Sequence, residues 1–171
     1  MPITTQTTLR RLIALGLAML LSLPLGANAA RSGEKFDDWT IQCETPEGMT
    51  EELCHAFLLV TVKEKNQRIL HVAVGYPPKQ ETPIAIVTVP LGVALQAGVQ
   101  VKVDDGKALP FPFNVCMSNG CQAGIKLESA MIEEWKKGQK LVVTFGNLKR
   151  QGLNVPVSLK GLTAALGALK K

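Results

Sequence analysis

The stretch Val99-Gln100-Val101-Lys102-Val103-Asp104 decides the fold class, because its side chains alternate between apolar and polar. That period of two is typical of a β-strand with one buried and one solvated face. The same alternation occurs in residues 39–43 (Trp-Thr-Ile-Gln-Cys) and 153–160 (Leu-Asn-Val-Pro-Val-Ser-Leu-Lys). Further runs are more continuously apolar and rich in valine and isoleucine, as inner strands tend to be: residues 54–62, 69–76, 84–89 and 141–145.

Turn residues separate these strands and predict hairpin connections. Asp104-Asp105-Gly106 and Ser118-Asn119-Gly120 place residues that tolerate a positive φ beside glycine. Pro110, Pro112 and Pro156 interrupt strand-like runs, which indicates edge strands because proline has no N–H to donate. We therefore expect an all-β fold, an antiparallel β-sandwich of about 8–9 strands.

Two segments depart from the β pattern and predict short α-helices. Residues 127–135 carry apolar side chains at helical spacing, and Gly138 follows as a stop signal. Residues 162–169 carry a second apolar helical face before Lys170 and Lys171, whose charges favour a helix C-terminus. The predicted sandwich thus includes one or two short α-helices.

Residues 1–29 have the features of a secretory signal peptide. Arg10 and Arg11 form the positive region, Leu12 to Leu25 the apolar region, and Ala27-Asn28-Ala29 the small residues of a cleavage site. At ~1.5 Å per residue the apolar region is too short for a ~30 Å hydrocarbon core, so we expect no transmembrane helix in the mature form. Residues 30–171 are then a single β-sandwich domain, located in the periplasm, at the outer membrane, at the cell surface or outside the cell.

The charge of the chain argues against one large class of partner. The formal net charge is +5, of which Arg10 and Arg11 contribute +2, leaving +3 for residues 30–171. Nucleic-acid-binding proteins usually cluster Lys and Arg on one face between aromatic platforms, and aromatic residues make up only 5% of this chain. We expect no nucleic-acid partner, whereas peripheral membrane association stays open beside a simply solvated surface.

In an exported chain the cysteines are expected to form disulfides. Four cysteines allow three connectivities, and the sequence does not settle which one forms. Cys116 and Cys121 flank a hairpin turn, and Cys43 ends one strand where Cys54 begins the next apolar run, so we prefer Cys43–Cys54 and Cys116–Cys121. A zinc site or a Cys-x-x-Cys redox site fits these spacings poorly, and we expect no metal and no cofactor.

The hairpin around the second cysteine pair poses a conflict. If Cys116 and Cys121 face each other in a regular ladder, Phe111 and Phe113 lie on the opposite face from Ala123. Either a bulge lies between Phe113 and Cys116, or the hairpin is covered on both faces. Phe111 and Phe113 are also the candidate partner-binding residues, because they lie on an edge marked by prolines; the alternative is that both rings fill the core.

The search for catalytic residues yields one weak pair. The sequence contains no nucleophile elbow, zinc-protease helix motif, phosphate loop or dinucleotide fingerprint. His55 and His71 fall on one face of two runs that could pair, so a two-histidine site stands beside the simpler interpretation of polar residues on a partly covered face. Acidic neighbours at 37–38, 51–52, 104–105 and 133–134 do not converge, as acid–base chemistry requires. We expect no catalytic residues and no enzyme.

A series of short motifs indicates more about this chain than its fold class. They are Phe36-Asp37-Asp38-Trp39, Cys43, Cys54, residues 89–99 (Val-Pro-Leu-Gly-Val-Ala-Leu-Gln-Ala-Gly-Val) leading to Val103-Asp104, Cys116, Gly120-Cys121-Gln122-Ala123, and residues 157–165 (Val-Ser-Leu-Lys-Gly-Leu-Thr-Ala-Ala). In this order they resemble the invasion-associated locus B family of Gram-negative bacteria over essentially the whole mature chain, with Leu162 where Phe is expected. The resemblance implies an exported β-rich protein, periplasmic or associated with the outer membrane, linked in some intracellular bacteria to invasion of red blood cells. It brings no catalytic residues.

These inferences lead to three functional hypotheses. The first is an exported, non-enzymatic envelope or surface binding protein, a virulence factor of host-cell invasion whose partner is an unidentified protein or envelope component. The second is a periplasmic housekeeping or accessory protein that assists other envelope proteins. The third is an enzyme that uses His55 and His71. An exposed apolar groove or an unpaired edge favours binding, and convergence of both histidines with a carboxylate favours the enzyme.

Overall fold

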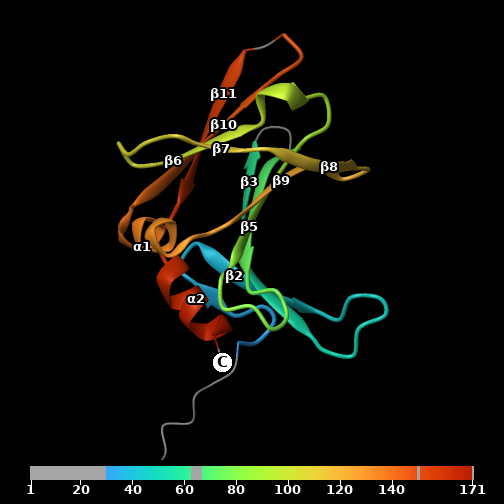
Figure 1. Cartoon of the computed structure of the whole chain (residues 1–171), viewed down its shortest axis with the longest axis vertical. Helices are drawn as coiled ribbons and strands as arrows, with labels where there is room; N and C mark the ends of the chain where they lie inside the picture. Colours follow the sequence, from blue (N-terminus) through green and yellow to red (C-terminus); the bar gives the residue numbers. More distant parts are fainter. Residues whose placement is uncertain (1–29, 63–66, 150, 171) are drawn as a thin grey trace, which may run out of the picture.

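A computed structural model describes residues 30–62, 67–149 and 151–170, which form two antiparallel sheets packed together (Figure 1). The large sheet has seven strands in the order β1-β2-β3-β4-β5-β9-β8, and the small sheet has four in the order β11-β10-β6-β7. The strands are β1 (Lys35–Phe36), β2 (Trp39–Glu44), β3 (Leu53–Val62), β4 (Gln67–Gly75), β5 (Ile84–Val89), β6 (Val99–Val103), β7 (Leu109–Phe111), β8 (Phe113–Met117), β9 (Gly120–Lys126), β10 (Lys140–Gly146) and β11 (Gly152–Ser158). The predicted signal peptide, residues 1–29, lies outside the described residues.

The prediction of an antiparallel sandwich with short helices is confirmed, with more strands than expected. β1 has only two residues. The run around Pro112 divides into β7, which belongs to the small sheet, and β8, which belongs to the large sheet. Pro112 joins the two strands and cannot donate to a ladder, so the chain crosses between the sheets at this residue. As the prolines predicted, β7 with Pro110 and β11 with Pro156 are edge strands.

Two α-helices occur where the apolar spacing predicted them: α1 (Ser129–Lys137) and α2 (Leu162–Leu169), with a short 3₁₀ turn η1 (Leu95–Ala97) between β5 and β6. Gly161 precedes α2 with φ +91°, and a side chain there would collide with the Phe36 carbonyl. Gly138 ends α1, as predicted, but with φ −72°, so the helix does not stop there through a left-handed residue. Glycine is needed there because a side chain would collide with Val103. No helix in the described ranges is long and apolar enough to cross a membrane.

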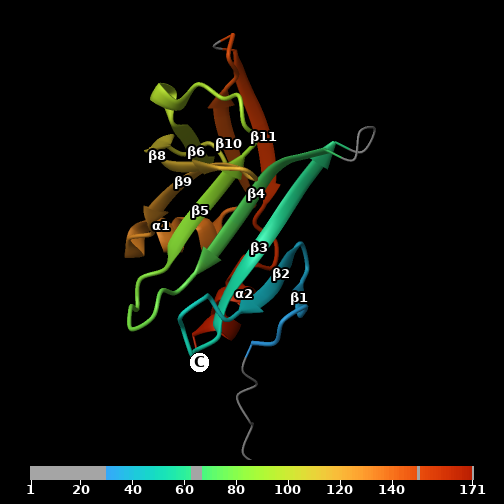
Figure 2. The same cartoon turned by 90° about the vertical axis from the view of Figure 1, so that its right-hand side faces the viewer.

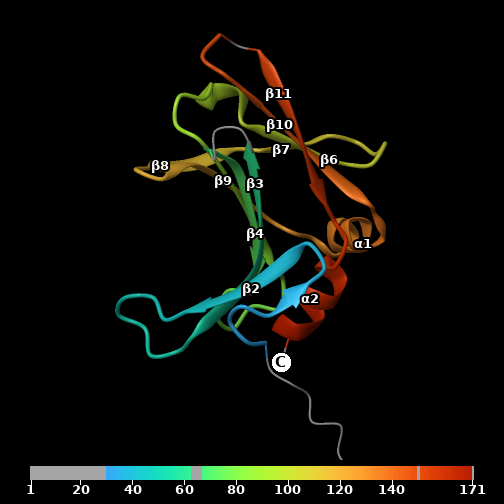
Figure 3. The ribbon, with the colours of Figure 1, turned by 180° about the vertical axis from the view of Figure 1, so that it is seen from behind.

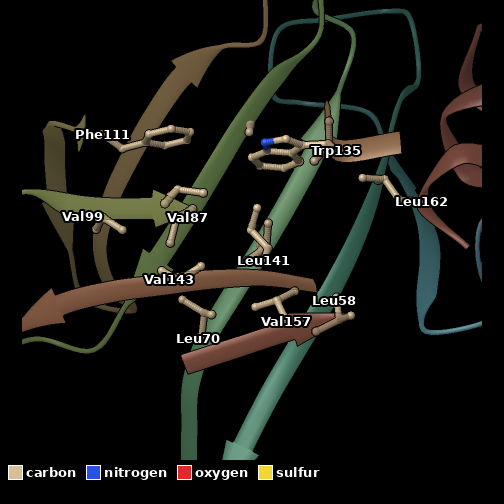
Figure 4. Close-up of a cluster of buried hydrophobic side chains, with 14 of the residues drawn as sticks. Leu58, Leu70, Val87, Val99, Phe111, Trp135, Leu141, Val143, Val157 and Leu162 are labelled. Atoms are coloured by element: carbon tan, nitrogen blue, oxygen red, sulfur yellow. The ribbon is translucent and has the colours of Figure 1, made fainter. Parts of the chain in front are cut away.

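The core lies between the two sheets and continues beneath α2. Figure 4 shows side chains of both sheets meeting in it, among them Leu70 and Val87 of the large sheet and Val143 of the small sheet. Trp39 is fully buried, and its indole Nε1 donates a hydrogen bond to the Ser158 carbonyl at 3.0 Å. Since Trp39 lies in β2 and Ser158 ends β11, this bond links the two sheets.

A bulge in β8 resolves the conflict in the second hairpin. The register of β8 against β9 shifts between Phe113 and Val115, so that Phe113 lies opposite Ala123 and Val115 opposite Gln122. The Gly124 N–H donates to the Asn114 side-chain oxygen at 2.7 Å, which satisfies a backbone group that the bulge leaves without its ladder partner. The extra residue turns Phe113 toward the core while Cys116 still faces Cys121.

Candidate functional site

The cysteines form the two preferred disulfides, Cys43–Cys54 and Cys116–Cys121. Each joins residues that lie directly opposite each other on neighbouring strands, β2 with β3 and β8 with β9. Glu52 lies near enough to the first pair that the three residues resemble a metal-binding group. The two sulfur atoms are bonded to each other, however, and a disulfide sulfur is not the thiolate that binds metal. These cysteines therefore join strands.

In three of the four acidic pairs, one residue makes a hydrogen bond or ion pair within the fold. Both side-chain oxygens of Asp104 accept backbone hydrogen bonds at 3.0 Å, one from Gln139 and one from Lys140, which fixes the start of β10 beside the end of β6. Asp37 pairs with Lys160 at 3.0 Å, and Lys136 donates to Glu133 at 2.9 Å. Lys136 lowers the pKa of the Glu133 carboxyl, and Asp37 raises the pKa of the Lys160 ammonium. Such pairs are typical of surface charges.

The structure places His55 and His71 on one face of β3 and β4, with an aromatic ring between them. The ring centroid of Phe57 lies 6.2 Å from that of His55 and 5.6 Å from that of His71. Burial lowers the pKa of both imidazoles. That of His71 falls to about 4, with further lowering by His55 and Arg68, while Glu44 opposes the shift at His55. Both side chains are therefore neutral at pH 7 and can exchange hydrogen bonds without carrying charge.

The sequence leaves two interpretations open for Phe111 and Phe113, partner binding or packing in the core, and the structure shows different burial for the two rings. Phe111 is 1% exposed and belongs to the core between the sheets, so its ring is not on the surface of the folded chain. Phe113 is partly buried and packs against the core edge. The core alternative therefore holds for Phe111, because Pro112 carries the chain from one sheet to the other and leaves the ring between them.

The candidate functional site is the outer face of the large sheet, the face turned away from the small sheet. Figure 2 looks onto it across β3, β4 and β5, and no described element lies over these strands. Leu59 is 43% exposed and Ile86 37%, although both belong to strands in the middle of the sheet. Val115 of β8 also lies exposed. Since successive residues of a strand point to opposite faces, these side chains alternate with fully buried ones such as Val87.

A groove of about 470 Å³ runs along this outer face. Its apolar lining comes from Leu53, Ala73, Ile84, Ile86, Tyr76, Pro46, Pro77 and Pro78, and its polar lining from Gln42, Glu44, His55, His71, Thr88 and Gln122. The hydroxyl of Tyr76 is buried and has no hydrogen-bond partner among the described residues, and burial raises its pKa. An apolar groove with a few hydrogen-bonding groups is suited to binding, because burial supplies affinity and the polar groups supply orientation.

Most residues of this groove were not singled out in the sequence. The sequence singles out His55 and His71, whereas for Ile84, Ile86 and Tyr76 it predicts only membership of apolar strands. The continuous apolarity of residues 69–76 and 84–89 was the available signal: it predicts strands whose two faces are both covered. The structure covers one face of these strands, so the second apolar face becomes the surface of the groove.

Comparison with known proteins places these features in a wider group. A family model described as invasion associated locus B (IalB) protein matches residues 39–170. Two invasion protein B homologs of Brucella abortus, from strain 2308 and from biovar 1 strain 9-941, are each 27% identical over 154 residues, covering 90% of this chain and 86% of the relative. The crystal structure of invasion associated protein B from Bartonella henselae has the same fold, with a TM-score of 0.70 and 23% identity over 80% of this chain and 92% of that one.

Proposed function

This chain belongs to the invasion associated locus B family, and from that membership we propose that it is an exported, non-enzymatic binding protein of the bacterial envelope or surface that promotes invasion of host cells. The names of the Brucella relatives, invasion protein B homologs, support the role in invasion. The partner is a protein of the envelope or of the host-cell surface.

One observation carries the binding role, namely the open apolar face of the large sheet. Leu59 and Ile86 expose large aliphatic side chains in the middle of this face: Ile86 lines the groove, and Leu59 lies opposite the groove residue His71 on the neighbouring strand. Apolar side chains that gather on an open surface favour association with a partner, because covering them removes apolar area from water. The neutral imidazoles of His55 and His71 supply hydrogen bonds that orient the contact.

Two features support export. Residues 1–29, outside the described ranges, have the composition of a signal peptide. Both disulfides are of the kind that persists in oxidising compartments. Together they favour the periplasm, the outer membrane or the outside of the cell as the place of action.

The experiment is deletion of the gene and complementation with variants, with the number of invaded red blood cells as the readout. We expect deletion to reduce invasion and the wild-type gene to restore it. The double variant Leu59→Ser, Ile86→Ser should fail to restore it at unchanged protein level. Met49→Ser should succeed, because Met49 is also 43% exposed but lies in the loop between β2 and β3 and not on a strand of the outer face.

The same strains separate the two other hypotheses. Normal invasion by the deletion strain, together with loss of other envelope proteins, would identify a housekeeping protein instead. Failure of a folded His55→Ala, His71→Ala variant that still captures the partner would instead identify an enzyme.

A further inference from the structure

Four exposed leucines gather at the end of the molecule farthest from the C-terminus. Leu148 is 77% exposed, Leu91 57%, Leu95 51% and Leu153 47%. They come from two connections, the segment 90–98 between β5 and β6 and the turn 147–151 between β10 and β11 with the start of β11. Figures 1 and 3 show both connections at the upper end of the molecule and the C-terminus at the lower end. We call this surface the leucine tip.

Hydrogen bonds hold the two connections together as one surface. Val93 forms an isolated bridge with Asn147, and the Ala94 N–H donates to the Gly146 carbonyl at 2.9 Å. Leu148 reaches over Gly92, where its Cδ1 lies 4.0 Å from the position of an added Cβ. The leucine tip is therefore formed jointly by two segments that lie about fifty residues apart in the sequence.

Hydrogen bonds around Asn147 hold the neighbouring Leu148, the most exposed of the four leucines, on the surface. The Asn147 side-chain oxygen accepts backbone hydrogen bonds from Lys149 at 2.9 Å and from Gln151 at 3.0 Å, and its Nδ2 donates to the Gln151 side chain at 3.0 Å. These bonds close the turn while Leu148 and Lys149 point to solvent. Hydrogen bonds that already hold Asn147, Lys149 and Gln151 in place reduce the conformational entropy lost when these residues dock.

Two described cations lie at or beside the leucine tip, and its segments 90–98 and 147–151 contain no aspartate or glutamate. Lys149 lies within the tip, and Arg68 lines a cleft of about 550 Å³ together with Leu91, Ser118 and Asn119. The loop between β2 and β3, at the other end of the molecule, has the opposite charge, because Glu47, Glu51 and Glu52 lie there without any lysine or arginine.

We propose that the leucine tip is a membrane-docking site that inserts its leucines into an anionic phospholipid surface. Exposed aliphatic side chains flanked by cations are suited to the boundary between headgroups and acyl chains, where burial and electrostatic attraction add. The cleft beside Arg68 takes a lipid phosphate. Docking through the leucine tip leaves the groove of the large sheet accessible from the side.

The test is co-sedimentation with lipid vesicles, using protein purified from the envelope of cells that export it, so that every variant has the same N-terminus. The vesicles contain phosphatidylcholine alone or phosphatidylcholine mixed with phosphatidylglycerol. We expect the wild-type chain to sediment with the anionic vesicles and to be released by high salt, which screens the attraction. The double variant Leu91→Ser, Leu148→Ser should bind at least about tenfold more weakly, the loss expected when burial of two leucine side chains is removed.

Two further variants test whether binding depends on the two cations and whether it depends on where the exposed apolar side chain lies. Lys149→Gln with Arg68→Gln should lower binding to the anionic vesicles only. Met49→Ser, on the acidic loop, should bind as the wild type does, and all variants should keep the wild-type melting temperature because their side chains are exposed.

Four results would overturn the proposal. They are absence of wild-type binding, equal binding to neutral and anionic vesicles, an equal loss in Met49→Ser, and a lipid-free dimer that the leucine variant abolishes. The last result would make the leucine tip a contact between copies of this chain.

Discussion

The two faces of the large sheet have similar apolar sequences and different surroundings. On the inner face, Leu58 and Val87 pack beneath the small sheet and the helices with little or no exposure. On the outer face, their sequence neighbours Leu59 and Ile86 remain open to solvent. The residue types hardly differ, so the difference arises from what lies over each face.

In this protein, a continuously apolar strand does not have both of its faces covered by the described chain. A half-buried strand of a soluble protein usually alternates apolar and polar residues, because the open face faces water. β3, β4 and β5 do not alternate, and yet only one of their faces is covered by the described chain. Packing within the described chain therefore does not explain why the outer face is apolar. We propose that the partner binds there.

The largest loss of stability is expected from removal of the Trp39 side chain, which is fully buried in the core. Trp39→Ala should lower the free energy of unfolding by about 3–5 kcal/mol, because a fully buried indole leaves a cavity. Trp39→Phe keeps much of the ring and loses the hydrogen bond to Ser158, so it should cost less. Urea unfolding measures both variants. A melting temperature for Trp39→Ala equal to that of the wild type would contradict the assignment of this side chain to the core.

The next prediction separates the two phenylalanines on either side of Pro112. Phe111→Ser should destabilise by about 3–5 kcal/mol, as expected for a large ring removed from a core, while Phe113→Ser should cost less because its ring is only partly buried. Unfolding of each single variant is the measurement. Loss of partner capture by a Phe111→Ser variant of normal stability would restore Phe111 as a contact residue.

The stability of the fold is expected to depend on pH through His71 on the outer face. The pKa of His71 is about 4 in the folded chain, below its ordinary value of 6.5, so between these values the unfolded chain binds more protons than the folded one. Stability should therefore be greatest above pH 6.5 and fall progressively as the pH drops toward 4. His71→Gln should reduce the fall between pH 6.5 and 5, where carboxylates contribute little. Equal urea midpoint changes in both proteins would refute this assignment.

The smallest effect on stability should come from the open side chains. Leu59→Ser with Ile86→Ser should change the free energy of unfolding by no more than about 0.5 kcal/mol per residue, as is usual for surface positions, while abolishing partner capture. The matched control is Leu58→Ser with Val87→Ser, which moves each substitution by one residue to the inner face and should destabilise strongly. Equal stability losses in the two pairs would show that the outer face is covered after all.

Much of this fold could be predicted because its signals are local. The alternation in residues 39–43, 99–104 and 153–160 predicts strands, since side chains alternate across any strand. Pro110 and Pro156 predict edges, since proline lacks a donor. The hairpin turn predicts the Cys116–Cys121 pair, and the clash of faces within that hairpin predicts either a bulge or two-sided cover; the structure has the bulge at Asn114. Family membership also follows from the order of short motifs along the chain.

Only the tertiary structure decided which faces are covered and which distant segments meet. Nothing in residues 109–117 says that β7 and β8 belong to different sheets, because that division depends on packing with β6 and β9. The need for glycine at position 138 arises from Val103, far away in the sequence. The groove and the leucine tip likewise combine separate segments. A strand's own residues set its period of two, whereas burial of each face depends on the elements that pack against it, and no short stretch of sequence contains that information.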